Sequence, residues 1–249
     1  MSTTQNLLEV RDVSRAFGGV KAVNGLSFDV RQGEILGLIG PNGAGKTTVF
    51  NLISGIQHPD SGSIQLSGQP IAGLRPDQVC AAGISRTFQT ASFLPGMSTY
   101  ANVELAAAFR PADKRRRRST AEVTEAALRA TDLLSVAHVD AEMLNVSQQK
   151  KLEIARAMAS EPLLMMTDEI VAGLNPTETN EVLDILMRLN AVGTTLVFVE
   201  HDVRAVLSLS NRLVVIAQGQ LLAEGDPREV ARSPEVIRVY LGNRYAGNH

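Results

Sequence analysis

The chain lacks several features that would assign it to a particular compartment or ligand class. Its 249 residues include one cysteine and no tryptophan, and only 4% are aromatic. A single cysteine, Cys80, excludes an intramolecular disulfide and is consistent with a reducing compartment. The scarcity of aromatic rings leaves few platforms on which nucleic-acid bases could stack.

Long hydrophobic runs and an excess of one charge are also absent. No apolar run approaches the ~20 residues that a membrane-spanning helix needs, and the polar stretch 1–6 lacks the features of a signal peptide. We therefore expect another chain to do any membrane spanning. The net charge of −2 gives no general indication of nucleic acid or an anionic membrane as partner, and 44% apolar residues suit one α/β domain with a core.

What the sequence does contain is a phosphate-binding pattern. The fixed positions of G-x-x-x-x-G-K-[ST] are filled by Gly40, Gly45, Lys46 and Thr47. An apolar run at 35–39 predicts a strand before them, and 47–54 predicts the start of a helix after them. Glycine lets backbone N–H groups approach an anion closely, and the positive end of the helix dipole adds to the attraction. The two matching flanks argue against the alternative, a chance glycine-rich turn.

Two further patterns complete a candidate nucleotide-hydrolysing site. The motif predicts that Lys46 reaches the β- and γ-phosphates and that the Thr47 hydroxyl binds Mg²⁺. A second apolar run ends in Asp168 and Glu169, at a strand end where ligands bind in such sheets. We expect Asp168 to hold Mg²⁺ and Glu169 to polarise the attacking water. The alternative, a solvated acidic turn, is disfavoured by the phosphate-binding pattern upstream.

His201 follows Glu200 at the end of another apolar run, at 196–199. There it could contact the γ-phosphate or orient the attacking water, although a single histidine is more often a capping or surface residue.

The order of the predicted elements indicates an α/β fold. We predict a P-loop NTPase core with a mixed sheet, formed by residues 1–89 and 161–249, and two alternating strands before the phosphate loop predict an N-terminal antiparallel β subdomain. A helical subdomain is expected at 90–160. Within it, Ser119 and Glu122 form a predicted capping box that opens a helix to about Leu134.

The basic run Lys114–Arg118 is the strongest charge cluster of the chain. We interpret it as a solvated loop between two helices of the helical subdomain. A contact with anionic lipid headgroups is the alternative.

Taken in order, these motifs resemble the ATP-binding subunit of ABC transporters over essentially the whole chain. The resemblance implies adenine stacking by Phe17, a Mg²⁺ ligand at Gln89 and a catalytic role for His201 beside Glu169 and Lys46. It also implies a D-loop formed by Gly173, Leu174 and Asn175. The nucleotide contacts that it implies are Phe17, Val23, Gly40, Pro41, Asn42, Gly43, Ala44, Gly45, Lys46, Thr47 and Thr48.

Three stretches look most like the branched-chain amino acid importers, and specifically like the longer of that system's two ATPase subunits. They are Arg-Thr-Phe-Gln at 86–89, Leu-Glu-Ile-Ala-Arg-Ala at 152–157 and Ala-Gly-Leu-Asn-Pro at 172–176. Importers of urea and short-chain amides are similar alternatives.

The resemblance implies ATP and Mg²⁺ as cofactors and a second ATPase subunit, a different chain, in a head-to-tail dimer. It further implies membrane-spanning permease subunits, a peripheral location at the cytoplasmic face of the inner membrane, and no nucleic-acid partner. A soluble ABC ATPase that acts on DNA or the ribosome would usually carry two cassettes or a long coiled coil. A GTPase would carry an Asn-Lys-x-Asp motif, which this chain lacks.

One family motif departs from its usual form. The signature loop, usually Leu-Ser-x-Gly-Gln, corresponds here to Leu144, Asn145, Val146, Ser147 and Gln148. In the family this loop closes on the γ-phosphate bound by the other subunit. Asn145 is longer than serine, and we expect the Cβ of Ser147 to crowd the phosphate and to disfavour a positive φ. The expected result is a weakened site on the partner, and tolerated drift is the alternative.

Overall fold

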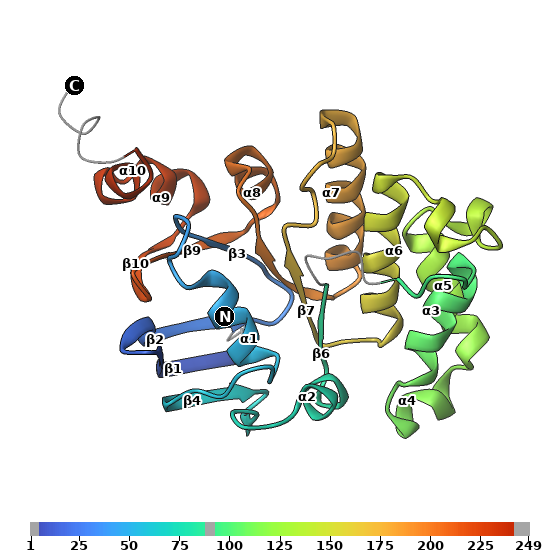
Figure 1. Ribbon diagram of the computed structural model, residues 1–249, viewed down its shortest axis with the longest axis horizontal. Coiled ribbons are helices and arrows are strands. Elements are labelled where there is room, and N and C mark those ends of the chain that lie inside the picture. Colours follow the sequence, from blue (N-terminus) through green and yellow to red (C-terminus); the bar gives the residue numbers. More distant parts are fainter. Residues whose placement is uncertain (1–4, 88–92, 242–249) are drawn as a thin grey trace. The chain divides into compact units, whose positions relative to one another are not determined.

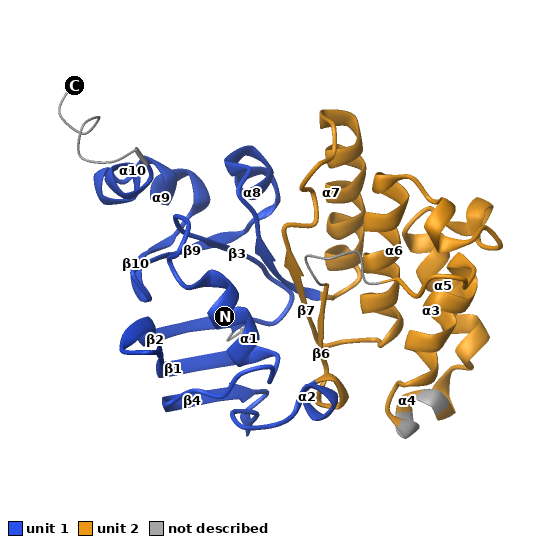
Figure 2. Cartoon of the chain, in the orientation of Figure 1, with its two compact units in different colours: residues 1–79, 195–249 blue, residues 80–194 orange. Residues whose placement is uncertain are grey.

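The computed structural model describes residues 5–87 and 93–241 (Figure 1). The chain forms two compact units, coloured separately in Figure 2. Unit 1 comprises residues 1–79 and 195–249, and unit 2 comprises residues 80–194. Unit 2 is longer than the helical subdomain expected at 90–160. That subdomain remains a prediction.

Unit 1 contains the predicted antiparallel sheet. Its strands follow the order β2-β1-β4-β5, with β1 paired antiparallel to both β2 and β4 (Figure 1). Alternate residues of β1, such as Leu8 and Val10, are buried, as the alternating pattern predicts. The strands are β1 (Asn6–Phe17), β2 (Val20–Arg31), β4 (Ser61–Leu66) and β5 (Gln69–Pro70).

The second sheet of unit 1 is mixed and carries the phosphate loop. The strand β3 (Ile35–Ile39) pairs in parallel with β8 (Thr195–Val199) and β9 (Arg212–Ala217), and β10 (Gln220–Gly225) pairs antiparallel with β9. Every residue of β3 and β8 is buried, which explains why both read as unbroken apolar runs. The helices of unit 1 are α1 (Lys46–Ile53), α8 (Val203–Leu209), α9 (Pro227–Arg232) and α10 (Pro234–Leu241), and α2 (Pro76–Ala82) spans the boundary.

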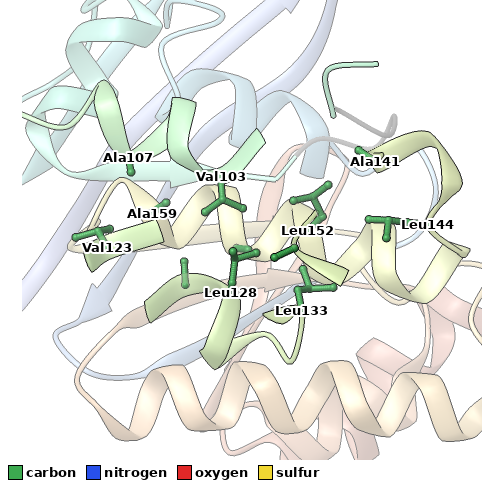
Figure 3. Close-up of a cluster of buried hydrophobic side chains, with 12 residues drawn as sticks. Val103, Ala107, Val123, Leu128, Leu133, Ala141, Leu144, Leu152 and Ala159 are labelled. Carbon is green, nitrogen blue, oxygen red and sulfur yellow. The ribbon is translucent and has the colours of Figure 1, made fainter. Parts of the chain in front are cut away.

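Unit 2 combines a parallel strand pair with helices. The strands β6 (Ile84–Arg86) and β7 (Leu164–Asp168) pair in parallel. The helices α3, α5 and α6 pack around a buried cluster in which Val103, Leu128 and Leu152 are at most 1% exposed (Figure 3). The helices are α3 (Thr99–Ala108), α4 (Ala112–Arg117), α5 (Thr120–Ala130), α6 (Val146–Ala159) and α7 (Pro176–Ala191), with short 3₁₀ turns at Leu134–Val136 and Ala141–Met143.

The capping box at Ser119 is confirmed, but its helix is shorter than predicted. The backbone N–H of Glu122 donates to Ser119 Oγ at 3.2 Å, and the backbone N–H of Ser119 donates to Glu122 Oε2 at 2.7 Å. The helix α5 ends at Ala130 rather than near Leu134. Asp132 takes φ = 60°, a left-handed conformation that an α-helix cannot continue through.

The basic run Lys114–Arg118 is largely helical rather than the predicted loop, although Arg116, Arg117 and Arg118 are exposed to solvent as expected. Most of it lies in α4, and two of its members bind Glu161: Lys114 Nζ donates to the carbonyl oxygen, and Arg118 Nη1 lies 3.1 Å from Oε1. The fully buried Arg110 reaches Oε2 of the same carboxylate at 2.7 Å. Glu161 therefore anchors both ends of this segment, through Lys114 and Arg118.

Within residues 5–87 and 93–241, no helix is both long enough and apolar enough to cross a membrane.

Candidate nucleotide-binding site

The phosphate loop joins the end of β3 to the start of α1 in unit 1, as predicted. Two of its glycines have backbone positions that no other residue fits. An ideal Cβ at Gly45 would lie 2.3 Å from the carbonyl oxygen of Ala22, and Gly45 has φ = 104°. At Gly40 the Cβ would lie 2.2 Å from the carbonyl oxygen of Ile216. The loop therefore packs its backbone directly against neighbouring strands.

Lys46 lies across the loop that it follows. Its side-chain amine donates to the carbonyl oxygens of Gly40 and Pro41, at 2.6 and 3.1 Å, and the residue is 8% exposed. These contacts hold a positive charge over the loop where phosphate is predicted to bind. Thr47, Asn42 and Gly43 are exposed, Thr48 is partly buried and Ala44 is buried.

Phe17, predicted to stack on adenine, and Val23, predicted as a further ATP contact, lie in the antiparallel sheet of unit 1. Phe17 is 42% exposed, and the guanidinium carbon of Arg15 lies 5.0 Å from its ring centre. This cation–π contact covers part of the ring that was predicted to stack on adenine. Val23 is fully buried in β2, so its side chain offers no surface to a nucleotide in this conformation.

The acidic pair belongs to unit 2. Asp168 is the last residue of β7 and is 2% exposed. Arg86, the last residue of β6, places Nη2 3.0 Å from Asp168 Oδ2. Burial lowers the pKa of Arg86, and the charge of Asp168 and its hydrogen bond oppose that shift. Arg86 belongs to the Arg-Thr-Phe-Gln motif at 86–89, and no local pattern in the sequence indicated this pairing.

Glu169 occupies a strained backbone conformation. Its φ is 53°, in the left-handed region that a residue with a Cβ enters at a cost of roughly 1–2 kcal/mol. Strain of this kind is often found at functional sites, and Glu169 is the predicted catalytic base.

His201 is an exposed residue of unit 1, two residues after β8. The helix α8 begins at Val203, where Asp202 caps it by accepting a hydrogen bond from the backbone N–H of Arg204 at 2.8 Å. Gln89, the predicted link between Mg²⁺ and the helical subdomain, lies outside the described residues.

The available donors suit Mg²⁺. The Thr47 hydroxyl and the Asp168 carboxylate are oxygen ligands, which this ion prefers. The described residues contain no group of three or more His, Cys, Asp or Glu side chains that could hold a metal ion. Mg²⁺ commonly needs no such cage, because water and substrate phosphates supply most of its ligands.

The D-loop residues Gly173, Leu174 and Asn175 lead into α7. Gly173 takes φ = 81°, and the Asn175 side chain accepts hydrogen bonds from the backbone N–H groups of Thr177 and Glu178, both at 3.0 Å. Asn175 is therefore the cap of α7, and both Gly173 and Asn175 are exposed.

The altered signature loop is closed by its own capping box. Asn145 Oδ1 accepts from the backbone N–H of Gln148 at 2.8 Å, and Gln148 Oε1 accepts from the backbone N–H of Asn145 at 3.0 Å. Ser147 lies inside α6 and is 5% exposed. The expectation that this position needs a positive φ is wrong, because the helix begins at Val146.

The chain has the features of a P-loop nucleotide-binding protein. In unit 1 a parallel strand and a glycine loop lead into a helix that starts at a buried lysine, and in unit 2 a strand ends in a buried aspartate. The family model described as "ABC transporter" matches residues 23–172. Since this is more than half of the chain, the chain belongs to the ABC transporter family, whose ATP-binding cassettes hydrolyse ATP. A second model, "Branched-chain amino acid ATP-binding cassette transporter", matches residues 220–246.

Two similar relatives match over nearly their whole length. The high-affinity branched-chain amino acid transport ATP-binding protein BraF of Pseudomonas aeruginosa is 38% identical, covering 95% of this chain and 98% of the relative. The corresponding protein LivG of Salmonella typhimurium is also 38% identical, covering 96% and 99%.

Solved structures have the same fold. The ADP conformation of MJ1267, described as an ATP-binding cassette of an ABC transporter, has a TM-score of 0.86 at 29% identity, covering 96% of this chain and all of that one. A dimeric bacterial cassette, MJ0796, has a TM-score of 0.76 at 23% identity, covering 89% and 99%, and supports the fold alone.

Proposed function

We propose that the chain is the ATP-hydrolysing subunit of an importer for branched-chain amino acids and that it drives transport through separate membrane subunits. The observation that carries the proposal is the match of residues 220–246 to the branched-chain amino acid cassette model. The 38% identity to BraF and LivG over nearly the full length supports the same substrate class. Urea, short-chain amides and other amino acids are the alternative cargoes.

The chemistry assigned to each residue follows its position and charge. Lys46 and the amides of the phosphate loop bind and orient the phosphates, and Thr47, Asp168 and Gln89 would hold Mg²⁺. The bound ion would neutralise charge that develops on the transferred phosphoryl group. Glu169 accepts the proton of the attacking water, and His201 orients that water for in-line attack.

We further propose that the active assembly is a head-to-tail dimer with a second ATPase subunit, docked peripherally on permease subunits at the cytoplasmic face of the inner membrane. In this arrangement the D-loop and the signature loop lie at the dimer interface. ATP binding closes the two subunits and hydrolysis reopens them, which moves the membrane partners.

Glu169→Gln tests the catalytic assignment. Removing the base should abolish turnover while ATP binding persists, so the complex should retain unhydrolysed ATP after gel filtration. Glu235→Gln, a change at an exposed residue of α10, should behave as wild type. Rapid hydrolysis by the Glu169→Gln complex would contradict the role of Glu169.

The transported molecule is tested in proteoliposomes that contain the complete complex with its permease subunits and binding protein. We expect ATP-dependent uptake of radiolabelled leucine and none of urea. Uptake of urea and not of leucine would show that urea, rather than a branched-chain amino acid, is the cargo. Failure of the chain to co-purify with any membrane subunit would favour a soluble ABC ATPase.

The signature loop predicts asymmetry between the two nucleotide sites of the dimer. Because Asn145 caps its own helix, its side-chain oxygen is engaged with the amide of Gln148, where the family places a phosphate contact. The double change Asn145→Ser and Ser147→Gly should therefore raise ATPase activity of the assembled complex. An unchanged or reduced rate would show that the loop is tolerated as it stands.

A further inference from the structure

The parallel strands β6 and β7 of unit 2 each end in a charged residue. Arg86 ends β6 and lies opposite Met166 in the strand register, and Asp168 ends β7. Nη2 of Arg86 is 3.0 Å from Oδ2 of Asp168, and the two side chains are only 7% and 2% exposed. An ion pair so well shielded from water is screened by salt much less than a surface pair.

A second contact ties Asp168 to the same segment. The backbone N–H of Asp168 donates to Thr87 Oγ1 at 3.3 Å, and the backbone N–H of Thr87 donates to the carbonyl oxygen of Met166 at 2.9 Å. Residues 86 and 87 thus hold Asp168 through both its side chain and its backbone. The carboxylate is fixed by contacts within unit 2 that involve no nucleotide.

We infer that Arg86 is a positioning residue for the metal site, which fixes the Asp168 carboxylate for binding Mg²⁺. This rests on the proposed role of Asp168 as a metal ligand. Carboxylates that bind metals are themselves held by hydrogen bonds, and losing such a partner typically reduces metal affinity about 10–100-fold. Arginine suits this task because its planar guanidinium is always charged and donates in fixed directions.

The test measures metal affinity without turnover. Mn²⁺ replaces Mg²⁺, ADP is the nucleotide, and electron paramagnetic resonance of free Mn²⁺ gives the Kd. Arg86→Gln should raise the Kd for Mn²⁺ by roughly 10–100-fold and leave ADP affinity in EDTA unchanged. The matched control is Arg188→Gln, because Arg188 pairs with Asp132 at 2.7 Å but is 53% exposed; its Mn²⁺ affinity should equal that of wild type.

A purely structural role for Arg86 gives a different result. Arg86→Gln should lower the Tm of the metal-free protein by roughly 5–15 °C whichever role is correct. If the role is purely structural, the Kd for Mn²⁺ stays unchanged. An unchanged or lower Kd overturns the inference. If Arg86→Gln does not fold, Arg86→Lys keeps the charge but loses the planar donors, and a wild-type Kd in that variant overturns it equally.

Asp168→Asn separates this inference from the proposed function. If Asp168→Asn weakens Mn²⁺ binding and Arg86→Gln does not, Asp168 is a ligand and only the role of Arg86 fails. If Asp168→Asn leaves Mn²⁺ binding unchanged, the metal-ligand assignment itself fails, and the inference about Arg86 fails with it.

Discussion

Neutralising Glu153 should stabilise the protein at neutral and alkaline pH. This carboxylate lies in α6, is 4% exposed, and has no hydrogen-bond partner on either oxygen within the described residues. Burial raises the pKa of Glu153 to about 7, although the charges of Lys150 and Arg156 partly oppose the shift. Lys150 Nζ is 3.7 Å from Oε1, too far for a good hydrogen bond.

The size and sign of the effect follow from proton linkage. Glu153 ionises near 4.5 in the unfolded chain and near 7 in the folded protein, so the folded state binds the proton more tightly. The free energy of unfolding should therefore fall as the pH rises from 4.5 to 7 and then level off. A pKa shift of this size lowers the free energy of unfolding by about 3 kcal/mol above pH 7 and by about 1 kcal/mol at pH 5.

Urea denaturation of wild type and Glu153→Gln, followed by circular dichroism at pH 5 and pH 8, measures this difference. Glutamine stays neutral, so the stability advantage of Glu153→Gln should grow by about 2 kcal/mol between the two pH values. The exposed Glu142 provides the matched control, and Glu142→Gln should show no such growth. An advantage that is equal at both pH values, or larger at pH 5, would refute the reasoning.

Three further predictions concern packing and backbone geometry, and urea denaturation checks each. Gly45→Ala should destabilise the protein more than Gly43→Ala. Both glycines have a positive φ, but only at Gly45 does the new methyl group meet a backbone oxygen, at 2.3 Å. Equal losses of stability would contradict this. Arg110→Met should cost about 1–3 kcal/mol by removing the hydrogen bond from the buried guanidinium to the partly exposed Glu161, and a loss below about 0.5 kcal/mol would refute it. Leu152→Ala, in the cluster of Figure 3, should cost about 2–5 kcal/mol, and a neutral effect would show that the core collapses around the gap.

Local sequence rules predicted the elements whose determinants lie within a few residues. The two members of the capping box, Ser119 and Glu122, are three residues apart, and the box was found where the sequence placed it. The phosphate loop belongs to the same class, because its glycines, lysine and flanking strand are contiguous. The ABC transporter resemblance, which depends on the order of such local motifs, is confirmed by the family match.

Local patterns are not sufficient where distant residues decide the structure. The basic run was interpreted as a loop from its charge, yet its helix is held by Glu161, more than 40 residues along the chain. Arg86 and Asp168 are separated by 82 positions, so no local pattern joins them. Glu153 follows the core residue Leu152, and a charge there gave no signal that the side chain would be buried.

Two buried carboxylates of unit 2 therefore have opposite energetic roles. Asp168 is matched by a guanidinium at 3.0 Å, whereas the ammonium nearest Glu153 is 3.7 Å away. Removing the partner of a well-paired buried charge is destabilising, but neutralising a poorly paired one removes a desolvation cost. Arg86→Gln should thus lower stability and Glu153→Gln should raise it at pH 8. If both changes shift stability in the same direction, partner distance is not what distinguishes these two charges.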